Sequence, residues 1–262
     1  MSYTKKLNVM NTKLFLSDIL PEEVREFFTD ASFNAYVVGG AIRDWLLGKT
    51  PIDFDLLIDG DISKIAPDFA SFVTGRIIEL DPERQIVRII YHRENSLITI
   101  DLTQLKEGLE PNLLSRDFTI NSLALKIPLS SDYETLTQRL LDVCGGVEDL
   151  ENSVVRMISA QNIMDDPIRI LRAVRISREL GFSIENDTRK CLQDKTTLIL
   201  SVAPERIRDE FLRILDCDNT TGSLLVLDRI GILTKIFPEL ELTKNVLQPK
   251  EHYWDVFNHL VQ

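Results

Sequence analysis

The chain has 262 residues, of which 44% are hydrophobic and 27% charged, and its formal net charge is −11. This length is enough for one large domain or two moderate ones with a buried core, and the composition is ordinary for a globular protein. No stretch approaches eighteen uninterrupted apolar residues, and the first twenty residues lack a continuous apolar segment with a small-residue cleavage site, so neither a membrane span nor a signal peptide is expected. The three cysteines are scattered without a CxxC pair, which argues against a disulfide framework or a zinc site and favours the reducing cytoplasm.

The acidic balance taken alone argues against nucleic-acid binding, which usually needs a basic surface. One segment is an exception, because arginines recur every third residue in RILRAVRISR, at Arg169, Arg172, Arg175 and Arg178. On a helix this spacing keeps all four side chains within one broad stripe. Without other signals, a solvated basic face paired with neighbouring acids is the simpler interpretation.

The first half of the chain predicts alternating strands and helices. Residues 18–30 have apolar residues at helical spacing, and residues 35–40 (AYVVGG) predict a strand that leads into a tight turn. A short helix over 41–48, which ends at Gly48, and a second strand over 51–60 follow. Further strands are expected over 76–81, 85–93 and 96–105. The apolar run of residues 118–127 is too short to decide between helix and strand.

From about residue 160 the pattern becomes helical. The strongest helix is predicted over 165–181, where Gly181 ends it. The other helical segments are expected over 187–201, 203–217 and 224–241.

Two aspartates separated by one residue are the main chemical signal. On a strand, Asp53 and Asp55 point to the same face while Phe54 points to the other. Two neighbouring carboxylates need a cation to neutralise them, and magnesium is often held by one or two carboxylates together with substrate phosphates. The preceding Gly39–Gly40 turn opens a helix, where backbone N–H groups favour phosphate, and Arg43 supplies a guanidinium for a bidentate phosphate contact.

Each of these features is weak alone, since a DxD on a strand is usually solvent-facing alternation and a GG pair is usually only a turn. Their order within about twenty residues resembles the active-site opening of the class II tRNA nucleotidyltransferase and bacterial poly(A) polymerase family, a branch of the polymerase β-like nucleotidyltransferases. Further segments resemble motifs of that family in the same order over residues 33 to 240: SRDFTINSLAL, LLDVCGGVEDLENSVVRMI, MDDPIRILRAVRISRELGF and PERIRDEFLRIL.

The resemblance implies a role for each matching position. Asp53 and Asp55 would bind the catalytic Mg²⁺ ions, and Asp166 and Arg169 would read the Watson–Crick edge of CTP or ATP in place of a template. Both C and A present an amine beside a ring acceptor, which a carboxylate and a guanidinium can recognise. The other expected nucleotide-binding residues are Gly40, Arg43, Arg116, Arg172 and Arg175. The arginine stripe thereby gains a functional interpretation.

Asp101 lies on an expected neighbouring strand, where such enzymes often place a third carboxylate; a strand-end carboxylate held by a neighbouring group is an equally good interpretation. Asp117 and Asn121 are expected to organise their loop rather than touch substrate. Departures from the family pattern are Asp165 in place of glutamate and Ser115 in place of a first arginine before Arg116.

The family resemblance leaves the product open. Only fourteen residues separate Asp101 from Arg116, where CCA-adding members carry a longer flexible loop. A CC-adding or otherwise restricted enzyme and a CCA-adding enzyme are therefore both hypotheses, with poly(A) polymerase activity a weaker one. Nucleotide transfer to a small molecule is disfavoured by the segment DDPIRILRAVR, and a non-catalytic RNA-binding module is disfavoured by the presence of both aspartates.

The predicted architecture is α+β: a polymerase β-like head over residues 1–150, an all-α neck over 151–220 and the start of a helical body over 221–262. The last segment resembles the entrance to an HD-type domain that ends before its metal ligands, so Asp255 and His259 are not expected to bind metal. The expected partners are tRNA, CTP and ATP, with no membrane.

Overall fold

A computed structural model of the chain describes residues 19–29, 32–83, 85–127, 139–246 and 255–261. The chain divides into two compact units, residues 1–152 and 153–262, which are considered separately below. The expectation about a signal peptide and part of the segment said to resemble an HD-type domain entrance, residues 247–254, fall outside the described residues. No helix in the described ranges is long and apolar enough to cross a membrane.

The first unit is built on a seven-stranded mixed sheet of order β3-β4-β5-β2-β1-β6-β7. The strands β2 and β5 pair in parallel, and all other neighbouring strands are antiparallel. This confirms the predicted α+β class. The strands are β1 (Asn34–Val38), β2 (Asp53–Asp59), β3 (Arg76–Asp81), β4 (Ile86–Arg93), β5 (Ser96–Gln104), β6 (Leu123–Ile127) and β7 (Leu140–Asp142).

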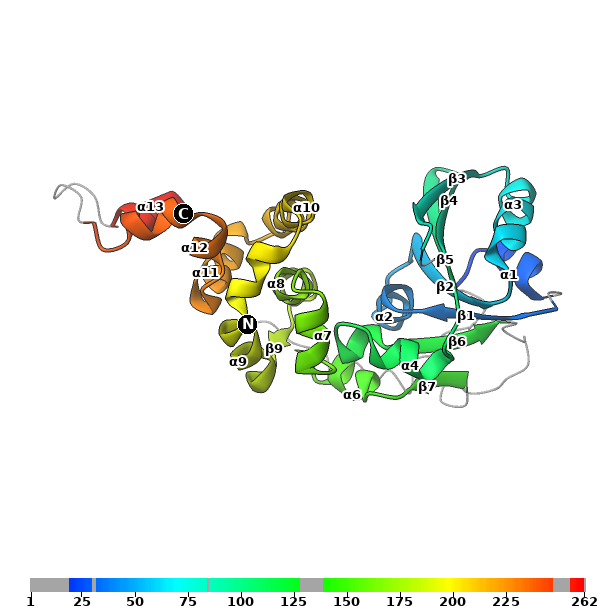
Figure 1. The fold of residues 1–262 in the computed structure, drawn as a ribbon, viewed down its shortest axis with the longest axis horizontal. Helices are drawn as coiled ribbons and strands as arrows, with labels where there is room; N and C mark the ends of the chain where they lie inside the picture. The colour runs from blue at the N-terminus through cyan, green and yellow to red at the C-terminus, as the bar shows by residue number, and fades with distance from the viewer. Residues whose placement is uncertain (1–18, 30–31, 84, 128–138, 247–254, 262) are drawn as a thin grey trace. The chain divides into compact units, whose positions relative to one another are not determined.

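Helices α1 (Glu22–Thr29) and α3 (Ile62–Phe72) cover one face of this sheet, and α2 (Gly40–Leu46) lies on the other side (Figure 1). The covered face is held by aromatic packing, since Phe69 of α3 contacts Phe28 of α1 and Tyr91 of β4 at ring-centroid distances of 5.2 and 6.5 Å. Asp61 caps α3 by accepting a hydrogen bond from the backbone N–H of Ser63. Sequence analysis assigned no element to α3, which contains Pro67.

The undecided segment 118–127 contains both a helical turn and a strand. A 3₁₀ turn, η3 (Thr119–Asn121), precedes β6. The first unit also contains α4 (Leu109–Leu114) and α6 (Gly146–Glu151).

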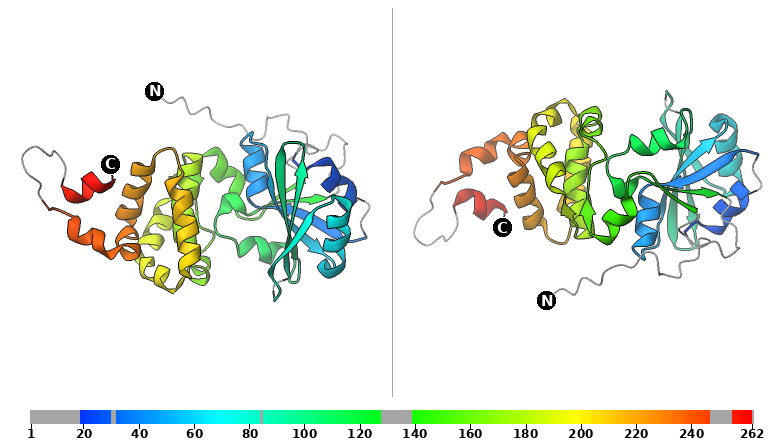
Figure 2. Two further views of the ribbon diagram at one scale, coloured as in Figure 1. Left: turned by 90° about the horizontal axis from the view of Figure 1, so that it is seen from above. Right: turned by 90° about the horizontal axis from the view of Figure 1, so that it is seen from below.

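The second unit is mainly helical (Figure 2), and its central helix is α8 (Arg169–Leu180). Gly181 ends α8 in the left-handed conformation with φ 69°, as the sequence predicted. Helices α10 (Pro204–Leu215) and α11 (Thr220–Ile230) pack against α8. The remaining helices are α7 (Ala160–Asp165), α9 (Asn186–Asp194), η4 (Thr196–Ser201), α12 (Leu233–Ile236), η5 (Pro238–Thr243) and α13 (Val256–Val261).

A small parallel pairing of β8 (Val154–Val155) with β9 (Ser183–Ile184) also lies in this unit. Strands of two residues leave no periodic signal, so the sequence did not predict them. The division of the helical part into neck and body at residue 220 stays a prediction.

Candidate active site

Asp53 and Asp55 lie on the exposed face of β2. Both residues are exposed, whereas Phe54 between them is only 2% exposed and faces the core with Leu56. The strand alternation that the sequence indicated therefore places both carboxylates on the face opposite α1 and α3. Hydrophobic burial of Phe54 and Leu56 fixes this orientation, because a shift of one residue would bury the two charges.

The glycine turn before α2 lies directly beside this pair. Gly39 has φ 80° and ψ −138°, a conformation that side-chain-bearing residues rarely adopt. A Cβ atom at this position would lie 2.5 Å from Arg116 Nη1 and 3.1 Å from Asp55 Oδ2. The backbone N–H of Gly39 donates to the carbonyl of Leu123 at 3.1 Å, which ties the turn to the start of β6. Glycine is thus required here for both conformation and space.

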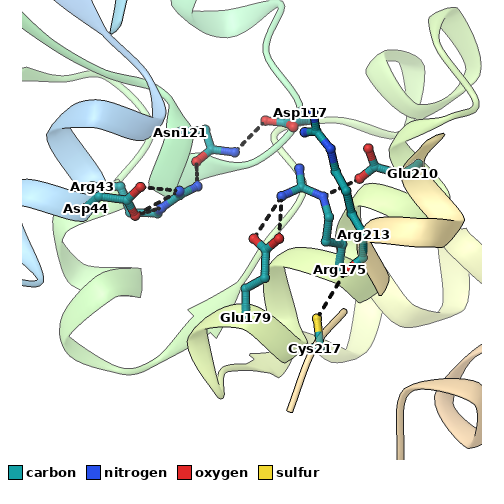
Figure 3. Close-up of polar contacts among 9 residues, drawn as sticks. All are labelled: Arg43, Asp44, Asp117, Asn121, Arg175, Glu179, Glu210, Arg213 and Cys217. Carbon is teal, nitrogen blue, oxygen red and sulfur yellow. Dashed lines mark hydrogen bonds and ion pairs between the residues drawn. The ribbon is translucent and has the colours of Figure 1, made fainter. Parts of the chain in front are cut away.

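Arg43, on the first turns of α2, is held in a hydrogen-bond chain (Figure 3). Its Nε and Nη2 donate to the carboxylate of Asp44 at 2.9 and 3.0 Å, and its Nη1 donates to Asn121 Oδ1 at 2.6 Å. The Asn121 amide in turn donates to Asp117 Oδ1, which also accepts from the backbone N–H of Phe118. Asp117 and Asn121 are each 5% exposed, so this chain fixes the loop that carries Arg116.

Arg116 reaches toward the aspartate pair. Its Nη1 lies 3.9 Å from Asp55 Oδ2 and 3.5 Å from the carbonyl of Asn121, and its side chain is 20% exposed. The structure therefore brings together the predicted residues Asp53, Asp55 and Arg116 with the Gly39–Gly40 turn. The preceding Ser115 hydroxyl donates to the carbonyl of Asn112 at 2.8 Å.

Asp101 lies beside Asp55 in the parallel register of β2 and β5. Its two carboxylate oxygens accept hydrogen bonds from Nε and Nη2 of Arg88 on β4, at 2.8 and 2.7 Å. The hydrogen bond to Asp101 is the main cause that raises the pKa of Arg88, and Asp53 and Asp55 add smaller contributions of the same sign. No local pattern indicated Arg88, because its pairing with Asp101 depends on the register between two neighbouring strands.

Asp53 and Asp55 fit a magnesium ion whose coordination sphere is completed by substrate. Asp53 and Asp55 offer exposed hard oxygen donors on one face, which is the donor type that Mg²⁺ takes. The described residues contain no group of three or more His, Cys, Asp or Glu side chains arranged to hold a metal. Two carboxylates therefore provide only part of a coordination sphere, and phosphate oxygens and water would supply the rest.

In the second unit, Asp166 and Arg169 lie at the junction of α7 and α8. Asp166 Oδ2 accepts a hydrogen bond from Arg206 Nη2 of α10 at 2.9 Å, and Arg169 Nη1 donates to the carbonyl of Asn162 at 3.2 Å. The backbone N–H of Arg169 also donates to the carbonyl of Asp166 at 3.0 Å. The two predicted base-reading side chains are thus adjacent and each is anchored. Asp165, the departure from the family pattern, is exposed and accepts from Gln161.

Arg175, two turns further along α8, joins that helix to α10 (Figure 3). Its Nε donates to Glu210 at 2.5 Å, and its Nη1 donates to both oxygens of Glu179 at 2.9 and 2.8 Å. Burial alone would lower the pKa of Arg175, but the charges of Glu210 and Glu179 outweigh it and the pKa is raised. The guanidinium thus serves as a structural ion-pair centre; its predicted contact with the nucleotide, like that of Arg172, stays a prediction.

Sequence analysis did not single out Arg206 and Glu210. They lie four residues apart on α10 and so on one helix face, a spacing that would have indicated two charges directed at one neighbour. Which neighbour they contact depends on the packing of α10 against α8.

A mixed sheet that presents two aspartates beside a Gly-Gly turn, with arginines alongside, defines a polymerase β-like nucleotidyltransferase head. The family described as "Poly A polymerase head domain" matches residues 35–156, and the family described as "Probable RNA and SrmB- binding site of polymerase A" matches residues 181–243. The chain belongs to the tRNA nucleotidyltransferase and bacterial poly(A) polymerase family.

Named relatives support this assignment. The chain is 34% identical over 234 residues to the A-adding tRNA nucleotidyltransferase of Deinococcus radiodurans, covering 87% of this chain and 51% of that protein. It is also 34% identical over 214 residues to the CC-adding tRNA nucleotidyltransferase of a Synechocystis species, covering 80% and 48%. Among solved structures, the Thermotoga maritima CCA-adding enzyme complexed with tRNA matches with a TM-score of 0.74 at 26% identity, covering 90% of this chain and 56% of that one.

The chain spans about half the length of these relatives. Enzymes of the family generally use a divalent metal ion.

Proposed function

We propose that this chain catalyses template-independent addition of C, A or both to the 3′ end of tRNA, using CTP or ATP and releasing pyrophosphate. The observation that carries the proposal is the placement of Asp53 and Asp55 on one exposed face, with the Gly39 turn and Arg116 against Asp55. The proposed site of action is the cytoplasm.

Each residue of the first unit has a proposed task. Asp53 and Asp55 would hold Mg²⁺, which when bound supplies positive charge that favours attack of the RNA 3′ hydroxyl on the α-phosphate and departure of pyrophosphate. Gly40 and Arg43 open α2 where its N-terminal backbone amides favour phosphate. Arg43 uses three of its five N–H donors in the chain to Asp44 and Asn121, so it retains donors for a phosphate oxygen. Arg116 would offset charge on the same phosphates.

The second unit would select the base. The Asp166 carboxylate would accept from the exocyclic amine that C and A share, while the Arg169 guanidinium would donate to the adjacent ring acceptor. The ion pair with Arg206 supports this assignment, because it holds the Asp166 side chain in one orientation. U and G lack this pattern of amine beside acceptor.

A product restricted to part of CCA is supported by one local feature. Only the four residues 105–108 connect the end of β5 to α4, so the first unit has no long loop at the place where CCA-adding members carry one. The relatives include A-adding, CC-adding and CCA-adding enzymes, so similarity alone does not select the product. We infer a CC-adding or otherwise restricted enzyme as the second hypothesis beside full CCA addition.

The test is incubation of purified protein with Mg²⁺ and tRNA that lacks its CCA end, with each labelled nucleotide alone and then CTP with ATP. Incorporation that requires Mg²⁺ and disappears in Asp53→Ala supports the proposal. Arrest after two C residues supports the restricted product, completion of CCA refutes it, and long A tracts indicate poly(A) polymerase activity. Absence of incorporation with every nucleotide and acceptor would refute the transferase proposal and favour a non-catalytic RNA-binding module.

A further inference from the structure

A polar cavity lies within the helical unit, away from Asp166 and Arg169. It has a volume of about 460 Å³ and is lined by the C-terminal part of α8 together with β9, α9 and α11. Arg178, which lines it, is nine residues beyond Arg169 on α8, or about 13 Å along the helix axis. The proposed base-reading residues therefore do not account for this cavity.

The lining of the cavity is positively charged in an otherwise acidic chain. Arg178, Arg189 and Arg229 all line it, and no Asp or Glu does, although the chain has 41 acidic residues against 30 Lys and Arg. Within the described part of the chain, these three arginines form no ion pair with a carboxylate. By contrast, Arg175 and Arg206 of the same unit are each paired.

Two of the arginines are fixed by their surroundings. Arg189 Nη2 donates to the carbonyl of Ile184 at 3.1 Å, which orients the guanidinium. The Nε atom of Arg178 is buried and has no hydrogen-bond partner. Its guanidinium lies beside Gly222 of α11, where a Cβ atom would lie 2.8 Å from Arg178 Nη2. A buried donor without a partner costs free energy, which an acceptor bound in the cavity would restore.

The partial negative charges of helix C-termini do not balance all of the positive charge that lines the cavity. Arg178 and Arg229 lie in the last turns of α8 and α11, where the helix termini carry partial negative charge. Each terminus amounts to roughly half an elementary charge. Two termini therefore offset about one of the three positive charges, and about two remain.

We propose that this cavity binds a backbone phosphate of the RNA acceptor. Three guanidiniums provide forked donors that match phosphate oxygens, and Gln193 and Ser183 add polar groups to the lining. Two arginines of the cavity, Arg189 and Arg229, lie within residues 181–243, which match a family described as a probable RNA-binding site. This inference rests on the proposed function, because it takes the same RNA as its ligand, and it gives that RNA a second point of attachment outside the reaction site.

The test compares RNA affinity between variants of the whole chain. Arg189→Gln with Arg229→Gln removes two exposed charges, so folding is preserved, and Arg208→Gln on α10 is the control because Arg208 is exposed and lies outside the cavity. Binding of labelled tRNA without its CCA end is followed by fluorescence anisotropy between 50 and 200 mM salt. We expect the double variant to bind about 10- to 100-fold more weakly at the low salt concentration. The slope of log affinity against log salt is expected to fall by about 2, since each lost phosphate contact lowers it by about 1.

The outcomes separate this inference from the proposed function. Binding of CTP with Mg²⁺ by the double variant should equal that of the unaltered chain, because the cavity is outside the reaction site. RNA affinity and slope equal to those of Arg208→Gln would overturn the inference, whatever the transferase activity. Lost affinity for inorganic phosphate or CTP with unchanged affinity for RNA would overturn RNA as the source of the phosphate. If the double variant loses RNA affinity while the unaltered chain incorporates no nucleotide, the result would support RNA phosphate binding in the cavity and refute only the transferase proposal.

Discussion

Arg88 and Asp101 form a bidentate ion pair in the same cross-strand row as Asp55. The register pairs Arg88 with Asp101 between β4 and β5, and Asp101 with Asp55 between β5 and β2. Side chains of directly paired residues share a face of the sheet, so a cation, a carboxylate and a proposed metal-binding carboxylate follow one another in a row. The two hydrogen bonds of 2.8 and 2.7 Å use an acceptor position on each oxygen of Asp101.

This row predicts opposite effects of two substitutions on magnesium affinity. Arg88→Met removes a positive charge about 10 Å from the metal-binding position, two strand spacings away. A unit charge at that distance from a divalent ion in water contributes about 0.8 kcal/mol, or about fourfold. We expect Arg88→Met to lower the Mg²⁺ concentration for half-maximal incorporation about fourfold. Asp101→Asn, only one strand spacing from Asp55, is expected to raise it about 20-fold, and the double variant is expected to lie between the two single variants.

The same titration decides whether Asp101 takes part in the reaction. A positioning role predicts that saturating Mg²⁺ restores most of the activity of Asp101→Asn. A rate that stays more than about 100-fold low at saturating Mg²⁺ would instead assign Asp101 to proton transfer.

The Gly39 turn predicts a substitution that harms both stability and function. Gly39→Ala places a methyl group 2.5 Å from Arg116 Nη1 in a backbone conformation that favours glycine. Strain and crowding together are expected to lower the free energy of unfolding by about 2 to 4 kcal/mol. Displacement of Arg116 is also expected to raise the KM for CTP. The measurements are urea denaturation and steady-state kinetics.

Gly48→Ala is the control for backbone strain. Gly48 also has a positive φ of 77°, but a Cβ atom there would contact nothing within 4 Å. We expect a loss of about 1 kcal/mol of stability and an unchanged KM. Equal KM values for the two variants would show that the Gly39 turn does not position Arg116 for the nucleotide.

Local sequence patterns predicted the elements that carry the site, whereas pairings between residues far apart in the sequence could not be predicted from them. Alternation around Phe54 indicated which face holds Asp53 and Asp55, because one face of β2 is buried. The arginine spacing likewise predicted a stripe on α8. The partner of Arg175 could not be predicted, since Glu210 lies 35 residues later and meets it only through helix packing. The pairing of Arg88 with Asp101 could not be predicted either, because it depends on the register between β4 and β5.

The pair of Asp166 and Arg206 predicts an effect on base selection. Asp166→Ala removes the proposed acceptor for the exocyclic amine, and a well-formed base contact contributes about 1 to 3 kcal/mol of discrimination. We expect kcat/KM for the preferred nucleotide to fall about 10- to 100-fold relative to that for UTP. Arg206→Met keeps the carboxylate but releases its orientation, so a smaller loss of up to about tenfold is expected. Arg208→Met is the matched control, and kcat/KM with all four nucleotides is the measurement.

Unchanged discrimination in Asp166→Ala would contradict the assignment of base reading to this residue. A loss in Arg206→Met as large as that in Asp166→Ala would show that the ion pair, rather than the carboxylate alone, makes the selective contact.

The buried pair of Arg175 and Glu210 predicts a large loss of stability when one partner is removed. The two side chains are only 12% and 9% exposed, so Arg175→Met leaves the Glu210 carboxylate buried without its main counter-charge. Such a change typically costs about 3 to 5 kcal/mol, whereas an exposed pair contributes less than about 1 kcal/mol.

The exposed pair of Lys190 and Asp187 provides the control through Lys190→Met. Denaturant unfolding of both variants gives the comparison. Replacing both partners, in Arg175→Met with Glu210→Gln, is expected to recover part of the loss because no unpaired carboxylate remains buried, Glu179 being exposed. A loss below about 1 kcal/mol in Arg175→Met would mean that the pair does not hold α8 to α10, and would favour a role for this arginine at the nucleotide instead.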